Sequence, residues 1–164
     1  MLIPILYNIR SIHNVGSILR TCDGFGINQV VCTGYTPHPQ KGLPHEQLRL
    51  METLHKTALG AEKTVESVYA LDIENAIKEY REQGFAVYAL EQASNSQNLA
   101  KFSTSEEKAI LILGEEVHGI PADILALCDQ ILEIPMRGQK ESFNVSVAAG
   151  IALYELKRLS LLGN

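Results

Sequence analysis

The sequence predicts an α/β domain built on a mostly parallel sheet with helices on both faces. Short apolar segments of about five residues alternate with helical segments of about ten residues or more, and glycine or proline stands at many of the junctions. With 164 residues, of which 46% are hydrophobic and 20% charged, the chain is long enough to bury a core. We therefore expect one domain that spans residues 1–164.

The first half of the chain is divided by glycines and by a proline-rich loop. Residue Asn14 is expected to open the first helix, and Gly24 and Gly26 are expected to stop it. A second helix ends at Gly60 in the same way. The predicted elements are strand 2–7, the helix from residue 14, strand 29–33, helix 45–59 and strand 65–70.

The second half repeats the alternation. Gly84 closes a helix and Pro121 starts one, whereas residues 92–105 are rich in Ser, Asn and Gln and are expected to form a surface loop. The last helix is apolar on nearly every side, which indicates burial on more than one side, as in a homodimer interface. The predicted elements are helix 73–83, strand 85–90, strand 109–113, helix 121–127, strand 130–134 and helix 144–162.

The net charge of −5 weighs against nucleic acid as a partner, because phosphate binding relies on Lys and Arg. The distribution of charge matters more than the total, however. Basic residues gather in one segment and around the polar motifs described below, while the acids gather in 62–91 and 106–133. These basic side chains either form a local basic face or are scattered over the surface in contact with solvent, and the sequence leaves both interpretations open. The residues are Lys41, Arg49, Lys56, Lys63, Arg10, Arg20, Arg137 and Lys140.

The three cysteines are odd in number and form no Cys-x-x-Cys pair, which is typical of buried thiols in a reducing compartment. No segment has the length of a transmembrane span, and the N-terminus lacks the features of a signal peptide. We therefore expect a cytoplasmic protein that does not interact with membranes. The five histidines show no metal-binding spacing with cysteines or carboxylates, so no metal is expected.

Ligands of parallel sheets usually bind beyond the carboxyl ends of the strands. Leu90, Gly114 and Ile134 lie at or near such ends. Ser142 and Asn144 stand at the head of the last helix, where they either cap that helix or help to receive a polar ligand. The sequence contains no G-x-G-x-x-G fingerprint, no P-loop and no Ser-centred hydrolase elbow, which disfavours a nucleotide-dependent oxidoreductase, an ATPase and a hydrolase.

Three segments carry a resemblance to a known family. They are residues 14–20 (Asn-Val-Gly-Ser-Ile-Leu-Arg) with a Gly-Phe-Gly at 24–26, residues 111–121 (Leu-Ile-Leu-Gly-Glu-Glu-Val-His-Gly-Ile-Pro), and residues 141–149 (Glu-Ser-Phe-Asn-Val-Ser-Val-Ala-Ala). In this order they closely resemble the three motifs of the SpoU/TrmH branch of the SPOUT methyltransferases. The resemblance implies a C-terminal trefoil knot, S-adenosylmethionine as methyl donor, an active site completed across a homodimer, and RNA 2′-O-ribose methylation.

The resemblance also implies roles for individual residues. The catalytic set is Arg20, Asn14, Glu116, Ser142 and Asn144, and the methyl donor would be bound by Leu90, Gly114, Ile134, Met136, Ser142 and Phe143. A guanidinium keeps its proton at physiological pH, so we expect Arg20 to bind phosphate and stabilise the developing alkoxide rather than to remove the proton. Glu116 is expected to hold Arg20 or a loop. The chain departs from the family pattern at Glu115, where Asn, Ser or Pro is usual, and at Phe143, where Leu is more common.

The motifs indicate the type of reaction more clearly than they indicate the RNA substrate. Many relatives carry an N-terminal RNA-binding domain, whereas this chain begins at the catalytic strand, and members built that way often act on transfer RNA. We therefore expect transfer RNA as the substrate, with ribosomal RNA as the second candidate. The alternative from another class is a non-catalytic RNA-binding protein that kept the fold, although such a protein need not have kept all five polar residues.

Overall fold

A computed structural model describes residues 1–38 and 44–162 of the chain. Twelve helices and strands make up the described fold, together with two short 3₁₀ turns at Ala61–Lys63 and Leu99–Lys101. In chain order they are β1 (Leu2–Tyr7), α1 (Ile12–Gly24), β2 (Gln29–Thr33), α2 (Pro44–Ala58), β3 (Glu66–Ala70), α3 (Ile73–Glu82), β4 (Ala86–Leu90), β5 (Gln97–Asn98), β6 (Ala109–Leu113), α4 (Ala122–Leu125), β7 (Gln130–Glu133) and α5 (Val145–Leu162).

All seven strands belong to one sheet in the order β3-β2-β1-β6-β4-β7-β5, and every neighbouring pair is parallel. The expected parallel sheet is confirmed. Strand β4 lies between β6 and β7, so Leu90 pairs with Leu113 on one side and with Leu132 on the other. Three strand ends that are far apart in the sequence therefore meet at one edge of the sheet.

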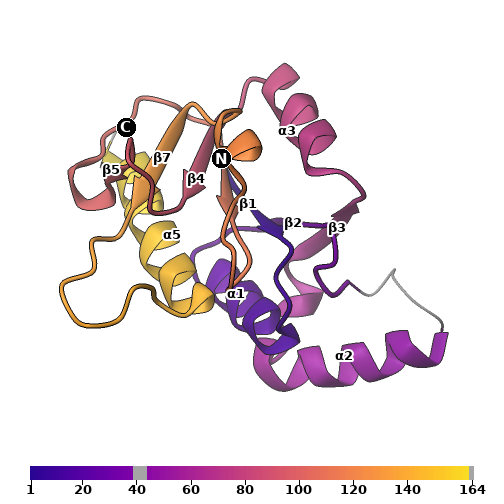
Figure 1. Cartoon of the computed structure of the whole chain (residues 1–164). Helices are drawn as coiled ribbons and strands as arrows, with labels where there is room; N and C mark the ends of the chain where they lie inside the picture. Colours follow the sequence, from indigo (N-terminus) through magenta and orange to yellow (C-terminus); the bar gives the residue numbers. More distant parts are fainter. Residues whose placement is uncertain (39–43, 163–164) are drawn as a thin grey trace.

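Helices cover both faces of the sheet, as the sequence predicts (Figure 1). Side chains alternate along a strand, so β6 sends Leu111 and Leu113 to one face and Ile110 and Ile112 to the other. The first face is covered by α1, α2 and α5, and the second by α3 and α4. All five residues of β6 are buried, which explains the unbroken apolar run that marks this strand in the sequence.

Two predicted boundaries are corrected by the structure. Helix α1 begins at Ile12 rather than at Asn14, because Ser11 is the N-cap and its hydroxyl accepts the N–H of Asn14 at 3.4 Å. The predicted loop 92–105 contains the short strand β5, in which Gln97 pairs with Leu132 of β7. A strand of two residues pairs through its backbone hydrogen bonds alone. It is too short to show the alternation of hydrophobic and polar residues by which a strand is predicted from sequence.

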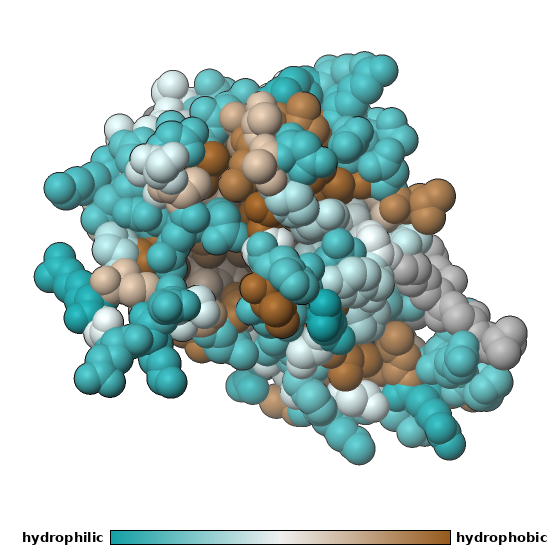
Figure 2. Space-filling model, viewed as in Figure 1, coloured by the Kyte–Doolittle hydropathy of each residue, from teal (hydrophilic) through white to brown (hydrophobic). Residues whose placement is uncertain are grey.

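Helix α5 buries one side and exposes hydrophobic residues on another. Ala149, Ala152 and Leu153 are fully buried against the sheet, whereas Val147 (50% exposed), Ile151 (37%) and Tyr154 (54%) are spaced by four and three residues and share one face. In the view of Figure 2 the surface is largely hydrophilic, with hydrophobic residues in small groups. Within residues 1–38 and 44–162, none of the helices combines the length and the apolarity needed to cross a membrane.

Candidate active site

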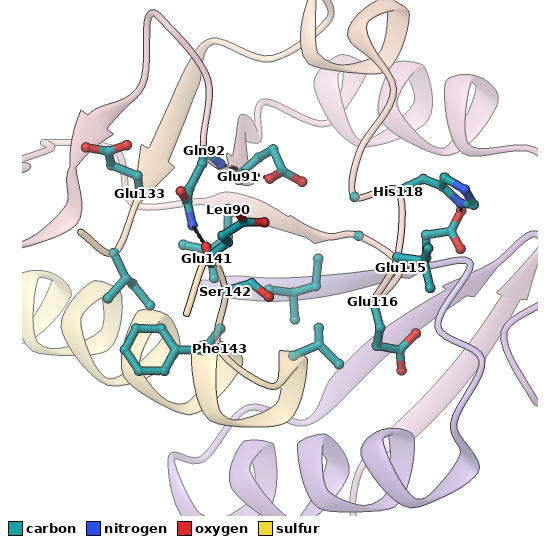
Figure 3. Close-up of a pocket in the computed structure, with 17 residues that line it drawn as sticks. Leu90, Glu91, Gln92, Glu115, Glu116, His118, Glu133, Glu141, Ser142 and Phe143 are labelled. Carbon is teal, nitrogen blue, oxygen red and sulfur yellow. Dashed lines mark hydrogen bonds and ion pairs between the residues drawn. The ribbon is translucent and has the colours of Figure 1, made fainter. Parts of the chain in front are cut away.

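A cavity of about 310 Å³ opens where the carboxyl ends of β4, β6 and β7 meet (Figure 3). Its walls come from the strand ends, from the two loops that follow β6 and β7, and from the first turn of α5. Both hydrophobic and polar side chains line it. They are Leu90, Glu91, Gln92, Leu113, Gly114, Glu115, Glu116, Val117, His118, Gly119, Glu133, Ile134, Glu141, Ser142, Phe143, Val145 and Ala148.

The loop after β6, residues 114–121, is tightly folded. Gly119 has a φ of +67°, and a Cβ atom there would lie 2.2 Å from Glu91 Oε2, so the position requires glycine for two reasons. The same carboxylate oxygen accepts the N–H of Ile120 at 3.0 Å. At Gly114, a Cβ atom would lie 2.7 Å from the carbonyl carbon of Gly119. The close neighbour that excludes a side chain from Gly114 is thus the loop itself.

Gln92 joins the end of β4 to the loop after β7. Its Nε2 donates to the carbonyl oxygen of Glu141 at 2.7 Å, immediately before Ser142 (Figure 3). Together, Glu91 and Gln92 attach both cavity loops to one strand end. Neither residue is among the site residues expected from the sequence, although their position directly after a predicted strand is the signal that could have identified them.

A chain of hydrogen bonds connects all three sequence motifs beside the cavity. Glu116 Oε1 accepts from Asn14 Nδ2 at 2.7 Å, and Asn14 Oδ1 accepts from Asn144 Nδ2 at 3.2 Å. Asn144 Oδ1 in turn accepts the N–H of Ser146 at 2.9 Å, so this amide also caps α5. Residues separated by more than one hundred positions are therefore held in one polar network.

Glu116 is charged at neutral pH in this network. Burial alone would raise the pKa of its carboxyl, but hydrogen bonds from Asn14 and from backbone N–H groups, among them that of Arg10, lower it below its ordinary value. Glu116 was expected to hold either Arg20 or a loop. Its observed partners are Asn14 and the backbone N–H of Arg10, in the loop before α1, which fits the second role. The guanidinium of Arg20 is not among its partners in the described structure.

The predicted cofactor residues are only partly gathered at the cavity. Leu90, Gly114, Ile134, Ser142 and Phe143 line it, whereas Met136 is not among its lining residues. Arg20 lies exposed on α1, outside the hydrogen-bond chain. Of the predicted basic segment, Arg49, Lys56 and Lys63 are exposed, and Lys41 lies outside the described residues.

Neither cysteines nor a metal cluster add chemistry to the described part of this site. Cys22, Cys32 and Cys128 form no disulfide with one another. In residues 1–38 and 44–162 no three His, Cys, Asp or Glu side chains form a group that could hold a metal ion. The expectation that the protein uses no metal stays a prediction.

Comparison with known proteins identifies the family. Residues 1–154 match the model of the SpoU rRNA Methylase family. The tRNA (guanosine(18)-2′-O)-methyltransferase of Thermus thermophilus is 32% identical over 157 residues, which cover 96% of this chain and 74% of that protein. A TrmH/SpoU tRNA modifying enzyme from A. aeolicus has a similar structure, with a TM-score of 0.82, 27% identity, and coverage of 98% of this chain and 76% of the other.

A second solved structure matches at nearly full length on both sides. It is described by the words "Structural insights into the 2-OH methylation of C/U34 on tRNA", with a TM-score of 0.77 and 27% identity. The match covers 100% of this chain and 98% of the other. Since the family model spans most of the chain, the resemblance carried by the three motifs is confirmed, and this protein belongs to the SpoU rRNA Methylase family.

Proposed function

We propose that this protein is an S-adenosylmethionine-dependent methyltransferase that modifies a ribose 2′-hydroxyl in transfer RNA. The observation that carries the proposal is the network of Glu116, Asn14 and Asn144, which joins three motifs beside a cavity at the strand ends. Membership of a methylase family supports the type of reaction. The SpoU rRNA Methylase description keeps ribosomal RNA as the second candidate substrate.

The cavity suits a ligand with an apolar ring and polar ends. Leu90, Ile134 and Phe143 provide hydrophobic walls, while Glu91 and Ser142 provide polar groups along the same cavity. Its volume of about 310 Å³ lies at the lower end of the range for small-molecule sites. S-adenosylmethionine, when bound, supplies an electrophilic methyl group on a sulfonium. Ile134 and Phe143 would pack on adenine, with Leu90, Gly114 and Ser142 around the rest. A contact of Met136 with the cofactor stays a prediction, because Met136 does not line the cavity.

The polar network would position the substrate. Asn14, fixed by Glu116 on one side and by Asn144 on the other, presents its amide in a single orientation. We assign to Arg20 the binding of an RNA phosphate and the stabilisation of the alkoxide that forms as the 2′-hydroxyl loses its proton. Asn144 and Ser142 stand at the start of α5, where the helix dipole adds to this stabilisation.

We also propose a homodimer that completes this site. The hydrophobic stripe of Val147, Ile151 and Tyr154 on α5 is exposed in the single chain, and a second copy would bury it. Arg20 is exposed and lies outside the hydrogen-bond chain, so its guanidinium is accessible to a second copy or to RNA. A specific interface of this type should bury more than about 1,000 Å².

Two further properties follow from the same family membership. We propose that the segments after β4, β6 and β7 form a trefoil knot, supported by the way their loops converge on a single cavity. We propose a cytoplasmic location, supported by three cysteines that form no disulfide with one another, two of which are buried. An RNA substrate, which is made and processed inside cells, agrees with that location.

The function is tested by methyl transfer in vitro. Purified protein is incubated with S-adenosylmethionine and either bulk transfer RNA or ribosomal RNA, and 2′-O-methylated nucleosides are quantified by mass spectrometry after digestion. We expect methylation of transfer RNA, and positions 18 and 34, which occur in the names of the relatives, are the first to map. Methylation of ribosomal RNA alone would correct the substrate, and methylation of neither RNA would overturn the function.

A further inference from the structure

Glu115, one of the two residues at which the sequence departs from the family pattern, interacts with three planar side chains, those of Arg10, Tyr35 and His118. Arg10 Nη2 forms an ion pair with Glu115 Oε2 at 3.1 Å, and His118 Nδ1 lies 3.1 Å from Glu115 Oε1. The guanidinium carbon of Arg10 also lies 5.7 Å from the centre of the Tyr35 ring, within the range of a cation–π contact. We refer to Arg10, Tyr35, Glu115 and His118 as the rim cluster.

The cluster is buried at its centre and open at its edge. The Glu115 side chain is 11% exposed, whereas the side chains of Arg10 and His118 are 57% and 72% exposed and Tyr35 is 47% exposed. In Figure 3, Glu115 and His118 lie on the side of the cavity opposite to Phe143. One carboxylate therefore fixes three groups whose flat faces or charged ends remain accessible to a ligand.

The position of Tyr35 depends on a specific backbone turn. Asn8, directly after β1, has a φ of +58°, and its Oδ1 accepts the N–H of Tyr35 at 3.0 Å. Gly34 has a φ of +62°, and a Cβ atom there would lie 1.8 Å from the same Oδ1. A positive φ is uncommon for a residue other than glycine, so Asn8 and Gly34 together define a specific turn that fixes the backbone from which the Tyr35 side chain extends.

The rim cluster is directly connected to the proposed catalytic network. The backbone N–H of Arg10 donates to Glu116 Oε2 at 3.3 Å, while its guanidinium pairs with Glu115. Adjacent acids thus hold the two ends of one arginine, and Glu116 also binds Asn14. A nucleotide strand whose ribose reaches Asn14 would therefore pass next to Arg10 and Tyr35.

Charge keeps the cluster assembled at neutral pH. Burial would raise the pKa of the Glu115 carboxyl, but hydrogen bonding by Tyr35 and His118 and the charge of Arg10 lower it below its ordinary value. The carboxylate is therefore ionised under physiological conditions. Its position next to Arg10 and Tyr35 restrains both side chains before any ligand arrives, which reduces the entropy that binding would otherwise cost.

We propose that the rim cluster binds the nucleotide next to the methylated one, with an unpaired base stacked on Tyr35 and its phosphate bound by Arg10. Aromatic rings and guanidinium planes are the groups on which proteins stack single-stranded RNA bases, and Arg provides the cation for the backbone. The inference rests on the proposed function, since RNA is the ligand, and it adds a specific binding surface to it. His118 extends the same planar surface toward the cavity.

The test compares variants of the full-length protein for their binding to bulk transfer RNA and to total ribosomal RNA, measured by filter binding at several salt concentrations. Tyr35→Leu should weaken binding about 10-fold, the scale of one stacked base, whereas Tyr35→Phe should keep most of the affinity. Arg10→Ala should weaken binding and reduce the slope of log Kd against log salt concentration by about one. Arg81→Ala is the matched control, because Arg81 is also half-exposed and paired with an acid, Asp129.

Calorimetry with S-adenosylmethionine and thermal melts accompany each variant. Cofactor affinity should be nearly unchanged in all of them, and so should the melting temperature of the Tyr35 variants. Arg10→Ala should melt slightly below the wild type, because it removes one partner of the Glu115 carboxylate. Wild-type RNA affinity in Tyr35→Leu and Arg10→Ala would overturn the inference. Equal losses of RNA affinity, cofactor affinity and melting temperature would also overturn it, because they indicate a purely structural cluster. Methyl transfer by the wild-type protein is scored separately. If neither RNA is methylated while Tyr35→Leu and Arg10→Ala still weaken binding selectively, the proposed function fails and the RNA-binding surface stands.

Discussion

Single side chains in this protein have two partners each, and their orientation depends on both. Asn14 donates to Glu116 and accepts from Asn144, while Glu116 binds both Asn14 and the backbone of Arg10. An amide between a carboxylate acceptor and an amide donor has only one low-energy orientation. A substitution that replaces the hydrogen-bond donor with an acceptor should therefore destabilise the protein more than a substitution that only removes the side chain.

The first prediction compares two changes at Asn14. Asn14→Asp replaces the donor that lies 2.7 Å from Glu116 with an oxygen, so two carboxylates would be in contact and one would have a raised pKa. At about pH 8 this variant should melt roughly 2–4 °C below Asn14→Ala, which only removes the contact. Protonation of one carboxyl relieves the repulsion, so the difference should disappear as pH falls toward about 5. Thermal melts across this pH range check it, and a difference independent of pH would contradict it.

The second prediction concerns Arg20. If its guanidinium binds phosphate and stabilises the alkoxide, Arg20→Ala should lower the single-turnover rate of methyl transfer by about 10²–10³. Cofactor affinity and melting temperature should stay nearly unchanged, because Arg20 is exposed and outside the hydrogen-bond chain. Arg20→Lys should recover only part of the rate, since an ammonium cannot reproduce the planar fork. Full activity in the alanine variant would rule out this role.

Glu115 allows a third prediction, on pH and stability. Its carboxyl pKa is lowered in the folded protein, so its ionised form stabilises the fold at pH values above the unfolded pKa of about 4.3. This contribution is lost as pH falls through the lowered folded value. Glu115→Gln should therefore melt below the wild type near pH 7, and the two melting temperatures should converge below about pH 4. Parallel melts of both proteins measure the effect, and a constant difference down to pH 3 would count against it.

At the scale of the element, the loop of residues 114–121 is attached to β4 through Glu91. The carboxylate accepts the N–H of Ile120 and occupies the space where a side chain on Gly119 would lie. Gly114 is enclosed by the same loop, so a larger residue there would distort the loop rather than simply fill the cavity. Gly119 therefore offers the more informative substitution.

The fourth prediction compares alanine at two glycines with positive φ. Gly119→Ala should destabilise the loop through strained backbone, about 1–3 kcal/mol, and through contact with Glu91, and it should weaken S-adenosylmethionine binding. Gly84→Ala carries the same type of backbone strain at a φ of +81° but meets no atom within 4 Å. It should lower the melting temperature and leave cofactor affinity unchanged. Calorimetry separates the two, and equal cofactor affinities would remove Glu91 and Gly119 from the site.

At the scale of the whole molecule, the exposed hydrophobic stripe of α5 should determine the oligomeric state. Ile151→Asp places a charge at the centre of the stripe, which should shift the protein to a monomer in sedimentation and abolish methyl transfer. Leu71→Asp is the control, because Leu71 is 83% exposed and lies outside the stripe. It should sediment like the wild type. A wild-type protein that is already monomeric at micromolar concentration would contradict the proposed dimer.

The sequence by itself determined the fold class and most of the elements. The run of residues 109–113 is apolar throughout because β6 is buried on both faces, and Gly84 ends α3 as predicted. The three motifs were sufficient to identify the family, because they combine specific polar residues and glycines in a defined order along the chain. These features depend on local backbone preferences and on burial, both of which leave a pattern along the chain.

Only the tertiary structure decided which side chains meet. Asn14 and Asn144 are separated by 130 residues, and nothing between them in the sequence indicates that their amides are bonded. Arg10, Tyr35 and Glu115 come from three different strand ends, and Glu91 at the end of β4 bonds Ile120 in the loop after β6. Such contacts depend on the order of strands in the sheet. Parallel pairing of β1, β6 and β4 brings their ends together, and a linear sequence does not encode that order in any local pattern.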